Sequence, residues 1–127
     1  MKQIIATNQA PAALGPYSQA VACKGEMLFV SGQVPIVPET GELISDDVRE
    51  QTDQVLRNLQ SILREGGMEM RDVVKATVFF TRIEDFAAIN EVYARYFNEA
   101  KPARAAVVAA DLVKNAKVEI DAIAVKG

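Results

Sequence analysis

Apolar side chains dominate the last quarter of the chain and predict two strands. Residues 103–110 are almost all alanine and valine around Arg104, whereas residues 118–125 alternate in polarity. Because successive strand side chains point to opposite faces, one face of the second strand is uniformly apolar: Val118, Ile120, Ala122 and Ala124. The other face is mixed: Glu119, Asp121, Ile123 and Val125. A sheet that is apolar on both sides needs a cover on both sides, from helices, another sheet or another subunit.

A helical period predicts a first helix over residues 46–65. Its apolar stripe consists of Val48, Val55, Leu56, Leu59, Ile62 and Leu63. Ser45, Asp46 or Asp47 can cap this helix, and Asp47 with Glu50 has the spacing of a capping box. Gly66 with Gly67 would end the helix.

A second helix is predicted over residues 84–99, after a strand over 73–81. Thr81 and Glu84 have capping-box spacing before it. The apolar stripe of this helix consists of Phe86, Ile89, Tyr93, Tyr96 and Phe97.

Two strands are predicted before the first helix, over residues 17–23 and 27–31, and residues 3–6 could add a short edge strand. The turn-forming segment Lys24-Gly25-Glu26 indicates that the strands on either side of it form a hairpin. Residues 34–42 contain two prolines and a glycine and predict a loop.

The element order β-β-α-β-α-β-β predicts a two-layer α+β fold, with two helices on one face of a mixed sheet. We expect residues 1–127 to form a single domain. The helices cover only one face, so we expect the face that carries Glu119 to be buried by self-association in a closed ring or dimer.

The composition narrows the possible chemistry. The chain has no histidine, which excludes a His-based triad, a histidine-containing zinc site and a His acid–base pair. With one cysteine, Cys23, it forms neither an internal disulfide nor a thiolate metal cage. Proton transfer must therefore use a carboxylate, a tyrosine, a lysine, a backbone group or water.

The charge and the motifs limit the possible partners. A net charge of −3 gives no electrostatic footprint for nucleic acid. No apolar run is long enough to span a bilayer and no signal-peptide pattern begins the chain, so we expect a cytoplasmic protein. No dinucleotide-binding or Walker motif is present, and we expect no cofactor and no metal.

Arg104 and Glu119 are the first candidates for chemistry, because each is an ionisable residue in an apolar strand. Arg104 is either half of a structural salt bridge or a clamp for a carboxylate or phosphate. Glu119 is either a solvent-facing residue or a desolvated acid–base group. If a hairpin closed over residues 111–116, Glu119 would face Val108, about 13 Å along the strand from Arg104. The two would then meet only across a subunit contact, or at opposite ends of a small ligand.

Four further residues are weaker candidates. Tyr17 follows a Gly-Pro turn, where its phenol either packs or lines a site. Ser31 and Gly32 end a strand, and the glycine permits either a bend or the close approach of a ligand. Asn90 is the amide within the apolar stripe of the second helix, where most such residues satisfy a nearby backbone group.

These residues fall within longer motifs. The motifs are Gly15-Pro16-Tyr17-Ser18-Gln19-Ala20, Val30-Ser31-Gly32-Gln33, Asp85-Phe86-Ala87 with Asn90 and Tyr93, and Pro102-Ala103-Arg104 followed by Val118-Glu119-Ile120. In these motifs the chain resembles the RidA family, also called YjgF, over nearly its whole length. The last pair of motifs, with its spacing, is the specific signature of that family.

The resemblance implies a fold like that of chorismate mutase, assembled as a homotrimer with clefts between subunits. It also implies hydrolysis of reactive 2-imino or enamine acids, such as 2-iminopropanoate and 2-iminobutanoate, to 2-oxo acids and ammonia. Arg104 would bind the substrate carboxylate, and Glu119 would position or activate the attacking water. Tyr17, Ser31 and Gly32 would line the site, with Asn90 at its edge.

One departure from the family pattern concerns Ala106. Many deaminase members of the family carry a cysteine at this position, two residues after the signature arginine, so only the Ala106 backbone remains to contact substrate. The segment between Asn90 and Arg104 is also shorter than in some members, which affects the rim of the pocket.

Two other functions remain as alternatives. Some family members are described as endoribonucleases or translation inhibitors, although RNA cleavage would lack its usual histidine pair here. The same pocket could also serve a non-catalytic trimer that binds a small ligand.

Overall fold

A computed structural model describes residues 2–127 of the chain. It contains helices α1 (Val48–Glu65) and α2 (Phe86–Phe97). The strands are β1 (Lys2–Ile5), β2 (Ala20–Cys23), β3 (Glu26–Gln33), β4 (Ile36–Val37), β5 (Glu42–Leu43), β6 (Val73–Phe80), β7 (Ala103–Val108) and β8 (Val118–Lys126). Short 3-10 helices precede β6, α2 and β8, and these are η1 (Met70–Asp72), η2 (Ile83–Asp85) and η3 (Val113–Asn115).

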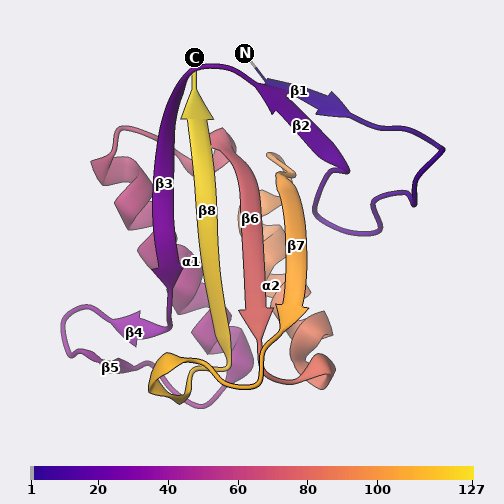
Figure 1. The fold of residues 1–127 in the computed structure, drawn as a ribbon. Helices are drawn as coiled ribbons and strands as arrows, with labels where there is room; N and C mark the ends of the chain where they lie inside the picture. Colours follow the sequence, from indigo (N-terminus) through magenta and orange to yellow (C-terminus); the bar gives the residue numbers. More distant parts are fainter. Residues whose placement is uncertain (1) are drawn as a thin grey trace.

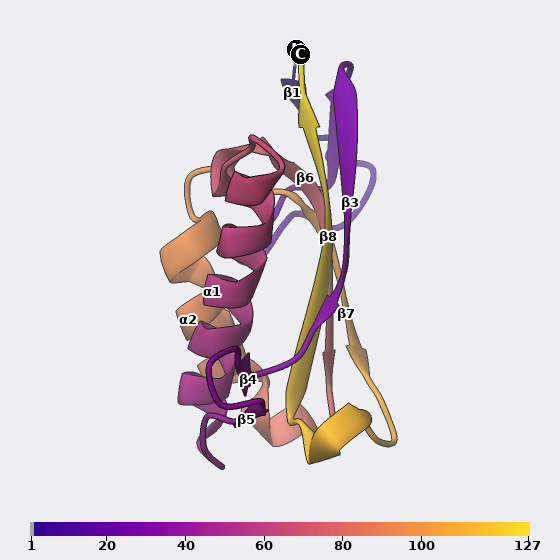
Figure 2. The ribbon, with the colours of Figure 1, turned by 90° about the vertical axis from the view of Figure 1, so that its left-hand side faces the viewer.

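The central sheet has four strands in the order β3-β8-β6-β7. Strand β7 runs parallel to β6, and the other neighbours are antiparallel, so the sheet is mixed. Both helices lie on one face of this sheet and leave the other face open (Figures 1 and 2). The predicted two-layer α+β fold, with two helices on one face, is confirmed.

The hydrophobic core lies between the helices and the sheet. The sheet contributes Ala76, Val78, Phe80, Val118, Ile120, Ala122 and Ala124, all almost fully buried. The helices contribute Val55, Leu56, Leu59, Leu63, Ile89, Val92, Tyr93 and Phe97. Burying one large apolar side chain stabilises the fold by about 1.5–3 kcal/mol, so the periodic pattern determines which face of each element turns inward.

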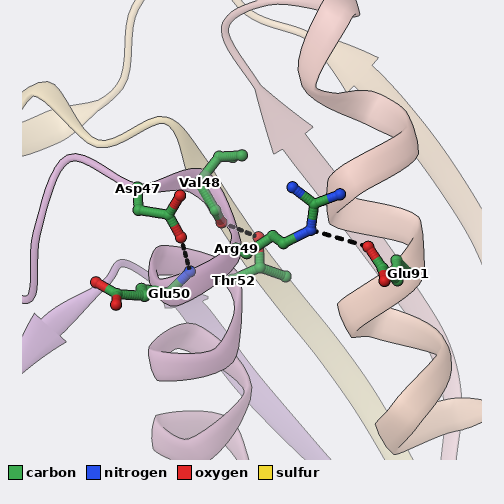
Figure 3. A network of polar contacts seen from close by, with 6 residues as sticks. All are labelled: Asp47, Val48, Arg49, Glu50, Thr52 and Glu91. Atoms are coloured by element: carbon green, nitrogen blue, oxygen red, sulfur yellow. Dashed lines mark hydrogen bonds and ion pairs between the residues drawn. The ribbon is translucent and has the colours of Figure 1, made fainter.

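Helix α1 begins at the predicted cap. Asp47 is the N-cap residue, and its carboxylate accepts a hydrogen bond from the backbone N–H of Glu50 at 2.9 Å (Figure 3). Gly66 ends the helix, with its N–H directed at carbonyls of the last turn. The Arg49 side chain pairs with Glu91 of α2 at 2.9 Å, which links the two helices at the surface (Figure 3).

The predicted start of the second helix is wrong. The Thr81–Glu84 capping box does not form: α2 begins at Phe86, after η2, and neither element has a side-chain cap. Glu84 pairs instead with Arg82 at 3.6 Å. The Phe86 ring stacks on Phe80 with 5.2 Å between centroids, so packing on β6 fixes where the helix starts.

The predicted hairpin between the strands on either side of Gly25 is also wrong. Strand β2 pairs with β1, with Lys2 opposite Cys23, in a separate two-stranded sheet. We call residues 2–23 the N-terminal arm, which extends away from the central sheet (Figure 1). Gly25 has a φ of +146°, and a Cβ there would overlap with the backbone of Lys126. The chain therefore turns tightly around the end of β8, and β3 pairs with β8 instead of β2.

The expected hairpin of the last two strands does not form either. Strand β6 lies between β7 and β8, with Ala76 paired to Arg104 on one side and to Ala122 on the other. Strand β6, helix α2 and strand β7 form a parallel strand–helix–strand unit, because the helix returns the chain to the end of the sheet where β6 began. The expected position of Glu119 opposite Val108 is therefore wrong.

The predicted loop over residues 34–42 contains a small hairpin of β4 and β5. Asn58 of α1 holds it, because its amide donates hydrogen bonds to the carbonyls of Val34 and Ile36 at 3.2 and 2.9 Å. Within the described range, neither helix has the length and apolarity needed to cross a bilayer.

The open face of the central sheet is partly apolar. Phe29 is 67% exposed and Met27 is 55% exposed. Phe29 lies opposite Ile123 of β8, two residues from Asp121 and four from Glu119 along that strand. This composition agrees with the expectation that a second face is covered by self-association, which stays a prediction.

Candidate functional site

Arg104 lies on β7 and points toward the helices. In the parallel ladder it lies beside Ala76 of β6, whose side chain is fully buried under the helix layer. Residues paired across neighbouring strands project from the same face of a sheet. The Arg104 side chain therefore extends under α2, where it is half-buried.

Neutral groups surround the Arg104 guanidinium. Its Nη1 donates a hydrogen bond to Asn90 Oδ1 at 2.6 Å. Three aromatic rings approach its Cζ, with centroids at 4.9 Å for Tyr17, 4.9 Å for Tyr93 and 5.6 Å for Phe86. At these distances the ring quadrupoles attract the cation. We call Tyr17, Phe86, Asn90 and Tyr93 the Arg104 cage.

The positive charge of Arg104 is not neutralised within the described part of the chain. No carboxylate of residues 2–127 forms an ion pair with it. Burial lowers the pKa of Arg104, while the neighbouring phenols of Tyr93 and Tyr17 act in the opposite direction. Arginine still remains charged at neutral pH. A half-buried cation without a counter-ion can bind a small anion, and its planar fork suits a carboxylate.

Tyr93 forms an uncharged wall of the cage. Its side chain is fully buried, and its hydroxyl has no hydrogen-bond partner among residues 2–127. Burial raises the pKa of Tyr93, so the phenol stays neutral at physiological pH. Its ring also packs on Phe97, with 4.6 Å between centroids.

Tyr17 reaches the cage because the N-terminal arm docks on the start of β7. The backbone N–H of Ser18 donates to the Pro102 carbonyl at 3.2 Å. The Ser18 hydroxyl, which is buried, donates to the Lys101 carbonyl at 2.6 Å. These two hydrogen bonds fix Ser18 at the start of β7. Because Tyr17 precedes Ser18, they also position the Tyr17 ring beside Arg104.

Gln19 organises the loop that precedes Tyr17. Its amide donates to the carbonyls of Thr7 at 3.0 Å and Pro11 at 2.6 Å, and its oxygen accepts the Thr7 N–H at 2.6 Å. The arm borders a groove of about 710 Å³, and half of the residues that line it are alanine or isoleucine. Tyr17 borders both this groove and the Arg104 cage.

Glu119 lies on the opposite face of the sheet from Arg104. Its neighbours in β8, Val118 and Ile120, are fully buried under the helices, so Glu119 projects from the open face. There it lies against Gly32 of β3. A Cβ at Gly32 would come within 2.9 Å of Glu119 Cδ, so only glycine leaves room for this carboxylate position.

The structure thus divides the predicted site residues into two groups. Arg104, Tyr17 and Asn90 lie together in the cage, and Ala106 follows two residues later on the same side of β7, where it is exposed. Each of these residues was predicted from the sequence, but their contacts were not.

Glu119 and Gly32 form the second group, with Ser31 adjacent in the chain. The sheet separates this group from the cage. Within one chain, therefore, Arg104 and Glu119 cannot contact the same small ligand.

Two cage residues, Phe86 and Tyr93, were not among the predicted site residues. The sequence assigned them to the apolar stripe of the second helix, and they do pack there. A signal was available: residues 86, 90 and 93 share one helix face at i, i+4 and i+7 spacing. An amide between two aromatic residues on one face indicates a polar partner opposite, and here that partner is Arg104.

The fold and the Arg104 cage define a small α+β protein with a half-buried arginine surrounded by neutral groups. A family model described as Endoribonuclease L-PSP matches residues 7–126 of the chain. The chain belongs to this family, which is the RidA (YjgF) family that its motifs resemble.

Relatives are similar over almost the whole chain. A RutC family protein of Pyrococcus horikoshii is 50% identical over 126 residues, which cover 99% of each chain. Reactive Intermediate Deaminase A, chloroplastic, of Arabidopsis thaliana is 45% identical over 123 residues, which cover 97% of this chain and 65% of the plant protein.

Solved structures are similar in fold as well as in sequence. Escherichia coli TdcF with bound serine is 44% identical, with a TM-score of 0.76 and coverage of 98% of this chain and 99% of that one. RidA from the Antarctic bacterium Psychrobacter is 43% identical, with a TM-score of 0.77 and the same coverage.

Proposed function

We propose that this protein is a cytoplasmic hydrolytic deaminase of reactive 2-imino acids, such as 2-iminopropanoate and 2-iminobutanoate. The observation that carries the proposal is the Arg104 guanidinium, which is held by neutral groups and has no carboxylate partner among residues 2–127. Every 2-imino acid has a carboxylate that such a cation can bind. The name of the Arabidopsis relative, a reactive intermediate deaminase, supports the same class of reaction.

The proposed active site is shared by two subunits of a homotrimer. Because Arg104 and Glu119 project from opposite faces of one sheet, the pair that acts on a single substrate comes from different chains. In this proposal, Glu119, Gly32 and Ser31 of one subunit face the Arg104 cage of the next. The exposed apolar side chains on the open face, including Phe29, support burial of that face in an assembly.

The proposed reaction consists of an addition and an elimination. Arg104 holds the substrate carboxylate and orients the C=N bond, whose nitrogen is protonated. Water attacks the imine carbon while the Glu119 carboxylate accepts a proton from the water, which gives a carbinolamine. The proton returns to nitrogen, and the carbinolamine hydroxyl gives its proton to Glu119 as the C–N bond breaks. Glu119 passes that proton to the departing ammonia, so a 2-oxo acid and ammonium leave. One water is consumed per imine, and no electrons are transferred.

The first test is clearance of 2-iminopropanoate, generated in the assay by an amino-acid oxidase and trapped with semicarbazide. We expect wild-type protein to reduce the trapped imine. Arg104→Ala should lower kcat/KM by about 30-fold or more, because a charge-assisted bond to the substrate is lost. Glu119→Gln should lower kcat by about 100-fold or more, because a positioned base is lost while the shape is kept. The matched control is Glu84→Gln, on the surface of η2.

Mixing the two inactive variants tests whether the site is shared. When Arg104→Ala and Glu119→Ala chains are refolded together, about a quarter of the sites in random trimers combine an intact Arg104 with an intact Glu119. We therefore expect activity to return in the mixture although neither variant is active alone. Mixtures that remain inactive, although mixed trimers are detected by mass spectrometry, would contradict a shared site.

Two results would replace the proposed function. If several short-chain imines are not cleared but carboxylates still bind at Arg104, the protein is a ligand-binding module. If purified protein cleaves RNA and Arg104→Ala abolishes the cleavage, the nuclease alternative becomes the better description.

A further inference from the structure

We infer that Asn90 is a positioning residue: it holds the Arg104 guanidinium by one nitrogen without neutralising it, which keeps the positive charge available for a bound carboxylate. The inference rests on the proposed function, because it concerns how that same site selects an anionic ligand. It gives Asn90, which the family resemblance places at the edge of the site, an indirect role exerted through Arg104.

The position of Asn90 fits this role. It lies one helical turn after Phe86 and three residues before Tyr93, on the face of α2 that packs over β7. Its side-chain oxygen is 2.6 Å from Nη1 of Arg104, a short bond typical of a charged donor. With rings from Phe86, Tyr93 and Tyr17 around it, the guanidinium is fixed before any ligand arrives.

The neutrality of the amide is the important property. An aspartate at position 90 would have almost the same shape and could accept the same hydrogen bond, but it would also cancel the charge of Arg104. In a half-buried site the interaction between opposite charges is stronger than in water. The choice of Asn over Asp therefore decides whether Arg104 binds an external anion or forms an internal ion pair.

The hydrogen bond to Asn90 uses only one nitrogen of the Arg104 guanidinium. A guanidinium has five N–H donors in one plane, and Asn90 accepts from Nη1. Among residues 2–127, the Arg104 side chain forms no hydrogen bond other than the one to Asn90, so donors remain for the two parallel bonds of a carboxylate.

A purely structural role for Asn90 leads to different expectations. If Asn90 only joined α2 to β7, then Asn90→Asp, which keeps the hydrogen bond and adds an ion pair, would preserve function. Asn90→Ala would be the damaging change, and it would act mainly through stability.

The test compares Asn90→Asp, Asn90→Ala and the matched control Asn98→Asp, which makes the same chemical change on an exposed residue next to α2. The ligand probe is pyruvate, a 2-oxo acid carboxylate, with uncharged pyruvamide as its counterpart, and binding is measured by calorimetry. Imine clearance gives KM and kcat for each variant, and thermal unfolding monitors the fold.

We expect Asn90→Asp to weaken pyruvate binding by about 30-fold or more, because the new carboxylate competes for Arg104. KM for the imine should rise similarly, with a smaller change in kcat and no loss of thermal stability. Asn90→Ala should weaken pyruvate binding by about 3- to 10-fold, because the Arg104 guanidinium loses its hydrogen bond to residue 90 but keeps its charge. Pyruvamide binding should be similar in all variants, and Asn98→Asp should behave as wild type.

The inference is overturned if Asn90→Asp binds pyruvate as tightly as wild type, or if it weakens pyruvate and pyruvamide binding equally. Failure of the proposed function gives a different result, namely wild-type protein that binds pyruvate through Arg104 but does not hydrolyse imines. In that case the effect of Asn90→Asp on pyruvate binding still decides whether Asn90 positions the cation.

Discussion

At the scale of single residues, the proposed site depends on two features that a list of the ionisable and nucleophilic residues in the sequence does not reveal. One is the Arg104 cage, in which an amide and three rings replace a counter-ion. The other is Gly32, whose missing side chain is the space that Glu119 occupies. The first feature positions the Arg104 guanidinium, and the second positions the Glu119 carboxylate.

Gly32→Ala tests the second feature. The added methyl would overlap with the Glu119 carboxylate, which lies at the end of a flexible side chain and can move away. We therefore expect kcat for imine clearance to fall by about tenfold or more, because the base is displaced. The free energy of unfolding should change by less than about 1 kcal/mol, as for most surface substitutions. Kinetics and urea denaturation would measure the two effects.

The control is Gly15→Ala, where an added Cβ would lie 3.7 Å from the Tyr17 ring, an ordinary contact distance. A Gly32→Ala protein with normal kcat would show that the precise position of Glu119 is unimportant. A Gly32→Ala protein that fails to fold would show that Glu119 cannot move aside.

The sequence identified most of the individual site residues but not their arrangement. Arg104 and Glu119 were recognisable because a charged residue in an apolar strand needs an explanation. Phe86 and Tyr93 were not, because an aromatic residue on the apolar face of a helix is indistinguishable from ordinary core in a sequence. Their role depends on Arg104, which follows Tyr93 by eleven residues and reaches them only through the packing of β7 under α2.

At the scale of secondary-structure elements, local signals predicted both helices, although not the start of the second, and predicted the strand partners poorly. Helix α1 begins at the predicted Asp47 cap and ends at Gly66, because capping depends on neighbouring residues. Strand pairing depends on segments far apart in the chain. The turn at Gly25 looks like a hairpin, yet β3 pairs with β8, which lies about a hundred residues further along.

Asp47→Ala tests the contribution of the α1 cap. The Glu50 N–H would lose its acceptor, and we expect the free energy of unfolding to fall by about 1 kcal/mol. Urea denaturation measures this loss. The matched control is Asp46→Ala, which removes a neighbouring carboxylate that does not form the cap. Equal losses in both variants would attribute the effect to net charge instead of the hydrogen bond.

At the scale of the whole molecule, the unequal covering of the two sheet faces is the main feature. One face is covered by α1 and α2 (Figure 2). The other carries exposed apolar side chains together with Glu119. Mixed apolar and charged surfaces of this kind are typical of faces that bind another protein chain.

Phe29→Asp tests whether the open face mediates self-association. Phe29 is 67% exposed, so a charge there is tolerated by a single chain but would be costly inside an interface. We expect wild-type protein to be trimeric and Phe29→Asp to be largely monomeric by size-exclusion chromatography with light scattering. The control is Ile83→Asp, a residue of η2 that is 62% exposed. A trimer that survives Phe29→Asp would indicate an interface elsewhere.

The placement of Arg104 and Glu119 on opposite faces of one sheet has a genetic consequence under the proposed assembly. A folded but isolated chain carries both residues and still contains no complete site. The activity in a cell therefore depends on how many chains are available for assembly, as well as on whether each chain has both residues intact. In a cell that expresses two defective alleles, one altered at Arg104 and the other at Glu119, mixed trimers would contain some sites built from the intact residue of each chain. Such alleles would complement each other, whereas two alleles altered at the same residue, or alleles that do not fold, would not.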